Sequence, residues 1–227
     1  MLSAIALSPQ APVLVPALAG LAAAEVAGIR DAAVAAAAVL PERWIAVGVG
    51  PAEQFIGPGN RGTFAGYGAD VAVALSPDTA ADTVALPLCA LFAGWLRGAA
   101  NPAARVEVRV YSADLDAAGA QARGRALRAE VEAADEPIGV LVLADGANTL
   151  NPSAPGGYDP AAQDIQNELD AALAAGNAEA LTRLPDGVVG RVAYQVLAGL
   201  APNPAAATAL AGDAPYGVGY FVGVWMP

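Results

Sequence analysis

The chain has 227 residues, of which 56% are hydrophobic and 15% charged, and it carries a formal net charge of −11 with neither histidine nor lysine. This composition excludes an intrinsically disordered chain, which has low hydrophobicity and high charge. The acidity argues against binding to nucleic acid or to anionic membranes, because both need clusters of basic side chains. We therefore expect one globular domain over residues 1–227.

Strand-like and helix-like segments alternate along the first two thirds of the chain. Apolar runs that predict buried strands lie at residues 2–7, 44–49, 69–75 and 138–144. Helical composition occupies residues 17–40, 80–99 and 116–134. Valine alternates with charge at 106–111, which predicts a strand nearer the edge, whereas the run at 138–144 is the most apolar and is expected to be central. Such strands predict an α/β fold: a single three-layer domain, with a mostly buried mixed sheet and helices on both faces.

The last third is predicted to be mainly helical. Asp159 is expected to cap a helix with Pro160 at its first position, and Gly176 is expected to close it. Residues Ile165, Leu169 and Leu173 form its apolar stripe. The remaining expected elements are a short helix capped by Asn177, helices at 188–200 and 204–210, and a closing strand at 216–225.

The sequence favours a cytoplasmic protein. The long apolar stretch at 17–40 contains Glu25, Arg30 and Asp31, so we expect no membrane span. No basic residue precedes the first apolar run, which is unlike a secretory signal peptide. Cys89 is the single cysteine and lies among leucines, so we expect a buried structural thiol.

The absence of histidine and lysine excludes several kinds of chemistry. Without histidine there are no Ser–His or Cys–His nucleophile pairs, and neither zinc sites nor two-histidine iron sites form from this chain alone. Without lysine there are no Schiff bases and no Walker-type phosphate sites. The segment Gly57–Gly62 matches G-x-G-x-x-G, but it does not open a helix, so we interpret it as a glycine-rich loop. Oxygen-only metal sites and two-carboxylate catalysis remain possible.

Candidate site residues lie in the loops that follow the predicted strands, where open α/β sheets place their ligands. They are Gln10, Glu53, Gln54, Asp145, Asn148 and Tyr158. The competing interpretation is turn chemistry for Asp145 and Asn148, and simple solvation for Glu53.

These loops resemble those of the class III extradiol ring-cleavage dioxygenase superfamily, in particular its catalytic B-subunit type. The resemblance is carried by Pro9-Gln10-Ala11-Pro12, Asp145-Gly146-Ala147-Asn148, the segments 154–160 and 171–177, and Tyr216–Tyr220, and by the order of elements along the whole chain. It implies that Gln10 stands where the family has an iron-binding histidine and that Asn148 stands where it has the acid/base histidine. The segment 188–200, where the family's carboxylate ligand is expected, contains no aspartate or glutamate.

The resemblance therefore implies a non-catalytic relative that keeps the fold without the Fe(II) cofactor, with no extradiol dioxygenase activity. A small-molecule pocket is expected at Gln10, Glu53, Gln54, Asn148 and Tyr158, and assembly as a homodimer or with a partner subunit is expected from the family. The alternative is an enzyme of another class, a Mg²⁺-dependent or metal-free hydrolase or isomerase, in which the carboxylates of Glu53 and Asp145 share a site. A third possibility is a metal site completed by histidines of a partner chain.

Overall fold

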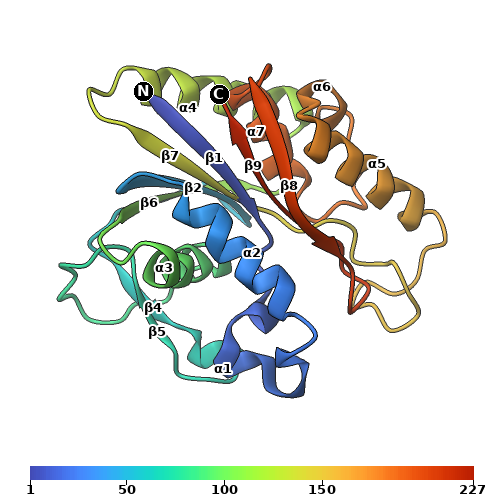
Figure 1. Cartoon of the computed structure of the whole chain (residues 1–227), viewed down its shortest axis with the longest axis horizontal. Coiled ribbons are helices and arrows are strands. Elements are labelled where there is room, and N and C mark those ends of the chain that lie inside the picture. The colour runs from blue at the N-terminus through green and yellow to red at the C-terminus, as the bar shows by residue number, and fades with distance from the viewer.

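A seven-stranded mixed sheet forms the centre of the computed structural model, which describes residues 1–227 (Figure 1). Its strand order is β3–β6–β2–β7–β1–β9–β8. The strands are β1 (Leu2–Ser8), β2 (Arg43–Gly50), β3 (Gln54–Ile56), β6 (Arg105–Ser112), β7 (Ile138–Leu143), β8 (Ala206–Asp213) and β9 (Tyr220–Met226). The strands β6, β2, β7 and β1 are parallel, and β3, β9 and β8 join them through antiparallel pairings. The expected mixed sheet is confirmed, with β7 in the middle.

The apolar runs form the middle of this sheet because both of its faces are covered. All six residues of β7 are buried, as are Trp44 to Val47 of β2. In β6 the valines at 106, 108 and 110 are buried and the charged residues between them are not fully buried. The alternation thus places β6 second from the edge, as predicted.

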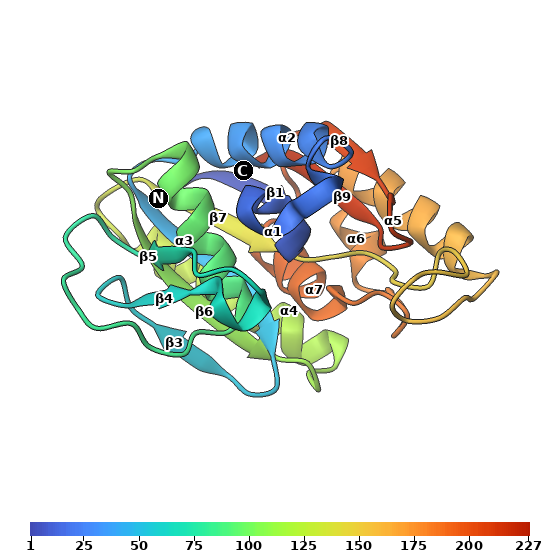
Figure 2. The same cartoon turned by 90° about the horizontal axis from the view of Figure 1, so that it is seen from below.

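Helices cover the two faces of the sheet. The helices are α1 (Pro16–Ala19), α2 (Ala27–Ala38), α3 (Leu88–Ala100), α4 (Ala117–Glu132), α5 (Ala162–Ala175), α6 (Ala178–Leu181) and α7 (Arg191–Leu200). Short 3-10 turns are η1 (Pro12–Leu14), η2 (Gly20–Ala23) and η3 (Phe64–Tyr67). One buried cluster lies under α2 and α3 and a second under α4, α5, α6 and α7, so the three layers are confirmed (Figure 2).

The helices α4 and α7 touch at the backbone. A Cβ added to Gly124 would lie 2.0 Å from Val196 O, and one added to Gly199 would lie 2.1 Å from Gln121 O. Only glycine fits at either position. This contact fixes α7 beneath the sheet.

Several predicted helix ends are confirmed by their caps. Asp116 Oδ1 accepts a hydrogen bond from Gly119 N at the start of α4, and Asn177 Oδ1 accepts one from Ala180 N at the start of α6. Gly176 closes α5 with a positive φ of 67°. Asp159 is not the cap, because α5 begins at Ala162; its side chain accepts from Ala161 N in the turn before the helix.

Five predicted elements have bounds that differ from the structure. The expected helix at 17–40 is broken into α1, η2 and α2. The expected helix at 80–99 begins only at Leu88, because Pro87 is extended and precedes its first turn. The helix expected at 188–200 begins at Arg191, and the closing strand begins at Tyr220. The third predicted strand is shorter than expected. It is β5 (Ala72–Ala74), which is not part of the main sheet and pairs with β4 (Arg61–Thr63).

The helix expected at 204–210 is wrong, because this segment forms the edge strand β8. Alanine favours helix by intrinsic propensity, but that preference is small. Antiparallel pairing with β9 from Ala206 to Asp213 satisfies the backbone instead, and Pro204 precedes the strand.

The thiol and glycine-loop expectations agree with the structure. Cys89 is buried, and burial raises the pKa of its thiol to about 11. The segment Gly57–Gly62 forms a turn and enters β4, not a helix. No helix combines the length and apolarity that a membrane crossing requires.

Candidate functional site

The carboxyl edge of the sheet, where the parallel strands β6, β2, β7 and β1 end, brings two predicted site residues together. β1 and β7 are neighbours, and Ser8 lies opposite Leu143, so their following loops leave the sheet side by side. The main-chain N–H of Gln10 donates a hydrogen bond to Asp145 Oδ1 at 3.1 Å. Asp145 therefore holds the loop of Gln10 in place.

The Asp145 carboxyl group lies in a half-buried position with two tyrosines nearby. Burial raises the pKa of Asp145 to about 6, although the hydrogen bond from Gln10 lowers it in part. Burial also raises the pKa of Tyr194 and of Tyr220, and the negative charge of Asp145 adds to both rises. Tyr194 on α7 donates its hydroxyl to Ala144 O at 3.0 Å. We call Gln10, Asp145, Tyr194 and Tyr220 the carboxyl-edge cluster.

Gln10 has an unusual environment within this cluster. Its Oε1 atom is buried and accepts no hydrogen bond from the protein. Leaving a buried acceptor without a hydrogen bond costs about 1–3 kcal/mol of folding free energy. Such an atom fits a position where a hydrogen-bond donor from outside the protein completes the structure.

The loop after β7 is held by a residue that the sequence did not identify, Gln166 on α5. Gln166 is buried; its Oε1 accepts from Ala147 N at 2.9 Å, and its Nε2 donates to Asp170 Oδ1 at 2.8 Å. A Cβ at Gly146 or at Gly219 would lie 2.1 Å from Gln166 Oε1. The available signal was a glutamine on the buried stripe of α5, between Ala162 and Leu169.

Asn148 packs within this loop, whereas Tyr158 lies on its outside. The main-chain oxygen of Asn148 accepts a hydrogen bond from Gly156 N at 2.9 Å, and a Cβ at Gly156 would lie 2.5 Å from Asn148 Oδ1. The amide of Asn148 thus packs against the returning loop. Tyr158 is 57% exposed at the outside of that loop.

Glu53 and Gln54 are not brought into the cluster. The Glu53 carboxylate pairs with Arg123 of α4 at 2.9 Å, and both side chains are nearly half exposed. Gln54 opens β3, the outermost strand on that side, and is exposed. Glu53 and Asp145 share no hydrogen bond.

The donor set of the cluster does not fit an iron site. No group of three or more histidine, cysteine, aspartate or glutamate side chains is placed to hold a metal ion. Gln10 and Asn148 offer neutral amides, and Asp145 is the one carboxyl group with them. The segment 188–200 was expected to hold the carboxylate ligand. There Arg191 forms an ion pair with Asp186 and donates a hydrogen bond to Gln195, so these side chains are engaged with one another. What the cluster can do is accept and donate hydrogen bonds.

Comparison with known proteins gives a likeness in fold. No family model matches the sequence, and no curated protein matches it. The crystal structure of uncharacterized protein JW3007 from Escherichia coli K12 superposes with a TM-score of 0.59 at 12% sequence identity, over 99% of this chain and 100% of that one. The two proteins share a fold. At this identity the likeness extends to the α/β architecture and not to the site.

Proposed function

We propose that this chain is a non-catalytic relative of the class III extradiol dioxygenases that binds a small polar molecule at the carboxyl edge instead of holding Fe(II). The observation that carries the proposal is the buried Gln10 Oε1, which has no protein partner and belongs to the residue that Asp145 anchors. Gln10 is also the residue that, by resemblance, replaces an iron-binding histidine.

The chemistry of the cluster favours a ligand that donates hydrogen bonds. Gln10 Oε1 is an acceptor, and the carboxylate of Asp145 is an acceptor when ionised. A molecule with two neighbouring hydroxyl groups satisfies both acceptors. Catechol is the simplest probe with these properties.

The test is a calorimetric titration of catechol, with 1,2-dimethoxybenzene as the analogue that donates no hydrogen bond. We expect saturable binding of catechol alone. Gln10→Leu removes the acceptor with little change of shape and should weaken binding about tenfold, the equivalent of one hydrogen bond of about 1.4 kcal/mol. Gln54→Leu, on the exposed strand β3, is the matched control and should bind normally.

Two results would contradict the proposal. One is equal affinity for catechol and its dimethyl ether, since the site would then not use hydrogen-bond donors. The other is unchanged binding in Gln10→Leu. The variant itself should fold, because replacing an unsatisfied buried acceptor with an apolar group is close to neutral for stability.

The alternative of a two-carboxylate enzyme gains no support from the geometry. Its two carboxylates would have to share a site, whereas Glu53 pairs with Arg123. Assembly as a homodimer or with a partner subunit stays a prediction from the resemblance, as does a cytoplasmic location from the composition.

A further inference from the structure

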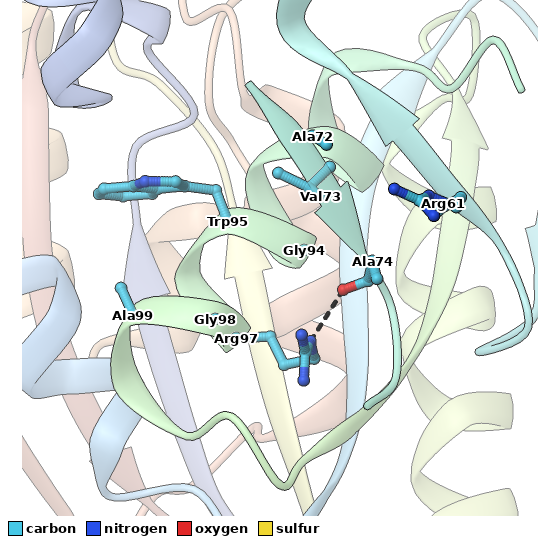
Figure 3. A pocket seen from close by; sticks show the side chains of 9 residues that line it. All are labelled: Arg61, Ala72, Val73, Ala74, Gly94, Trp95, Arg97, Gly98 and Ala99. Carbon is cyan, nitrogen blue, oxygen red and sulfur yellow. Dashed lines mark hydrogen bonds between the residues drawn. The ribbon is translucent and has the colours of Figure 1, made fainter. Parts of the chain in front are cut away.

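A pocket of about 400 Å³ lies between helix α3 and strand β5 of the small sheet, away from the carboxyl edge (Figure 3). Arg97 lies in the last turn of α3 and donates to Ala104 O, just before β6 begins, so this pocket sits toward the opposite edge of the main sheet. None of its nine lining residues is acidic. The volume is within the range of small-molecule sites, about 300–1,000 Å³.

The pocket is lined by arginines that have no acidic partner. Eight of the 11 arginines lie within 4.0 Å of a carboxylate, and Arg61, Arg97 and Arg125 do not. Two of these three, Arg61 and Arg97, line this pocket. In a chain with a net charge of −11, two uncompensated guanidinium groups therefore lie in one pocket.

Arg97 is held with its charge unpaired. The residue is only 8% exposed; Nε donates to Ala74 O at 2.8 Å and Nη1 to Pro102 O at 2.6 Å. These carbonyl groups orient the guanidinium group but carry no charge, and Nη2 has no partner in the protein. A buried charge is costly without a counter-charge, and burial lowers the pKa of Arg97.

Arg61 lines the pocket from the neighbouring strand β4. In the β4–β5 pair Arg61 lies opposite Ala74, the residue whose carbonyl group accepts from Arg97. Arg61 Nε is buried and has no hydrogen-bond partner. Two guanidinium groups with unused donors thus flank Ala74 (Figure 3).

The rest of the pocket is apolar. Val73 and Trp95 line it, and Trp95 lies on the side of α3 away from both guanidinium groups (Figure 3). Helix α3 packs closely against β5 at Gly94, where an added Cβ would lie 3.2 Å from Val73 Cβ. A Cβ at Gly98 would meet nothing within 4 Å, so this glycine leaves open space in the pocket.

We infer that this pocket binds a small organic carboxylate with an aromatic or other apolar body. The carboxylate lies at Arg61 and Arg97, since the planar guanidinium group matches a carboxylate with paired hydrogen bonds. The body lies along Val73 and Trp95. The inference is independent of the proposed function, because it uses no residue of the carboxyl-edge cluster.

The first test is titration of benzoate against its neutral analogue benzamide, followed by calorimetry, with inorganic phosphate as the third probe. We expect benzoate to bind at least about tenfold more tightly than benzamide or phosphate. Equal binding of benzoate and benzamide overturns the inference, as does tighter binding of phosphate, which would indicate a site for a bare anion. Absence of saturable benzoate binding up to about 10 mM, about tenfold weaker than a millimolar Kd, overturns it as well.

The second test uses paired variants that leave Arg97 intact, because that side chain ties three backbone carbonyl groups together. Arg61→Gln should weaken benzoate binding about tenfold, while Arg125→Gln, which removes the same charge from an exposed position lining a different pocket, should not. Gly98→Phe should fill the open space and abolish binding, while Gly98→Ala should retain it. Equal loss in the two arginine variants, or full binding in Gly98→Phe, overturns the inference.

Discussion

The carboxyl group of Asp145 holds the loop of Gln10 while itself lying in a place that disfavours its charge. Its Oδ1 accepts the main-chain N–H of Gln10 at 3.1 Å, yet burial raises the pKa of Asp145 to about 6. Because this value exceeds the usual value of 3.8, the folded state binds a proton more tightly than the unfolded state. Ionisation of Asp145 therefore opposes folding.

The raised pKa of Asp145 predicts the direction in which stability changes with pH. As pH rises from about 4 to about 6, ionisation of Asp145 should lower the free energy of unfolding by up to about 3 kcal/mol, and the loss should stay constant at higher pH. Asp145→Asn keeps an oxygen acceptor for Gln10 and removes the charge. We expect this variant to be more stable than the wild type at pH 8, with a difference that shrinks toward pH 5.

The measurement is urea unfolding of both proteins from pH 5 to pH 8. Taking the difference between them cancels the contributions of the other acidic residues. A variant that is less stable than the wild type at pH 8, or a difference that grows as pH falls, would show that the charged form of Asp145 supports the fold.

At the scale of elements, backbone contact between α4 and α7 decides how tightly the second layer packs. Gly124 and Gly199 each face a main-chain carbonyl group of the other helix, at 2.0 Å and 2.1 Å from an added Cβ. Since a carbonyl oxygen of a helix cannot rotate away, any side chain at these positions has to separate the helices. The contact also fixes Tyr194, which α7 carries into the carboxyl-edge cluster.

We therefore expect Gly124→Ala to destabilise the protein by about 3 kcal/mol, the upper end of the usual cost of overpacking. Gly28→Ala is the matched control, because Gly28 lies in helix α2 with nothing within 4 Å of an added Cβ. It should stabilise the protein by about 0.5–1 kcal/mol through helix propensity. Thermal unfolding of the two variants checks both signs, and a neutral Gly124→Ala would contradict the close contact.

Elements were predictable from the sequence where one local signal dominated. The strands β1, β2 and β7 followed from apolar runs because both faces of the central sheet are covered, and α4 followed from the helical composition of residues 116–134. The segment that became β8 was predicted as helix, since its alanines carry no mark of the pairing with β9. The secondary structure of this segment depends on a partner strand that the local sequence does not reveal.

At the scale of the whole molecule, site residues were likewise predictable where a local signal placed them, and not where they depend on long-range packing. Gln10 and Asp145 were placed together because both follow parallel strands, and the hydrogen bond between them agrees with that placement. Glu53 follows the next strand along, but its partner Arg123 comes from α4, on the covering layer. The pocket of Arg61 and Arg97 depends on the packing of α3 against the small sheet, a long-range contact with no local sequence signal.

The molecule as a whole thus carries a sheet edge with hydrogen-bonding groups, and by our proposal this edge binds a small polar molecule instead of holding Fe(II). The most direct test of the central claim is oxygen uptake by the purified protein with added Fe(II) and catechol, recorded together with the absorbance of ring-cleavage products. We predict no uptake above that of Fe(II) and catechol without protein. Uptake that requires the protein and is lost in Gln10→Leu would show that the carboxyl edge holds a working iron centre, and would contradict the account.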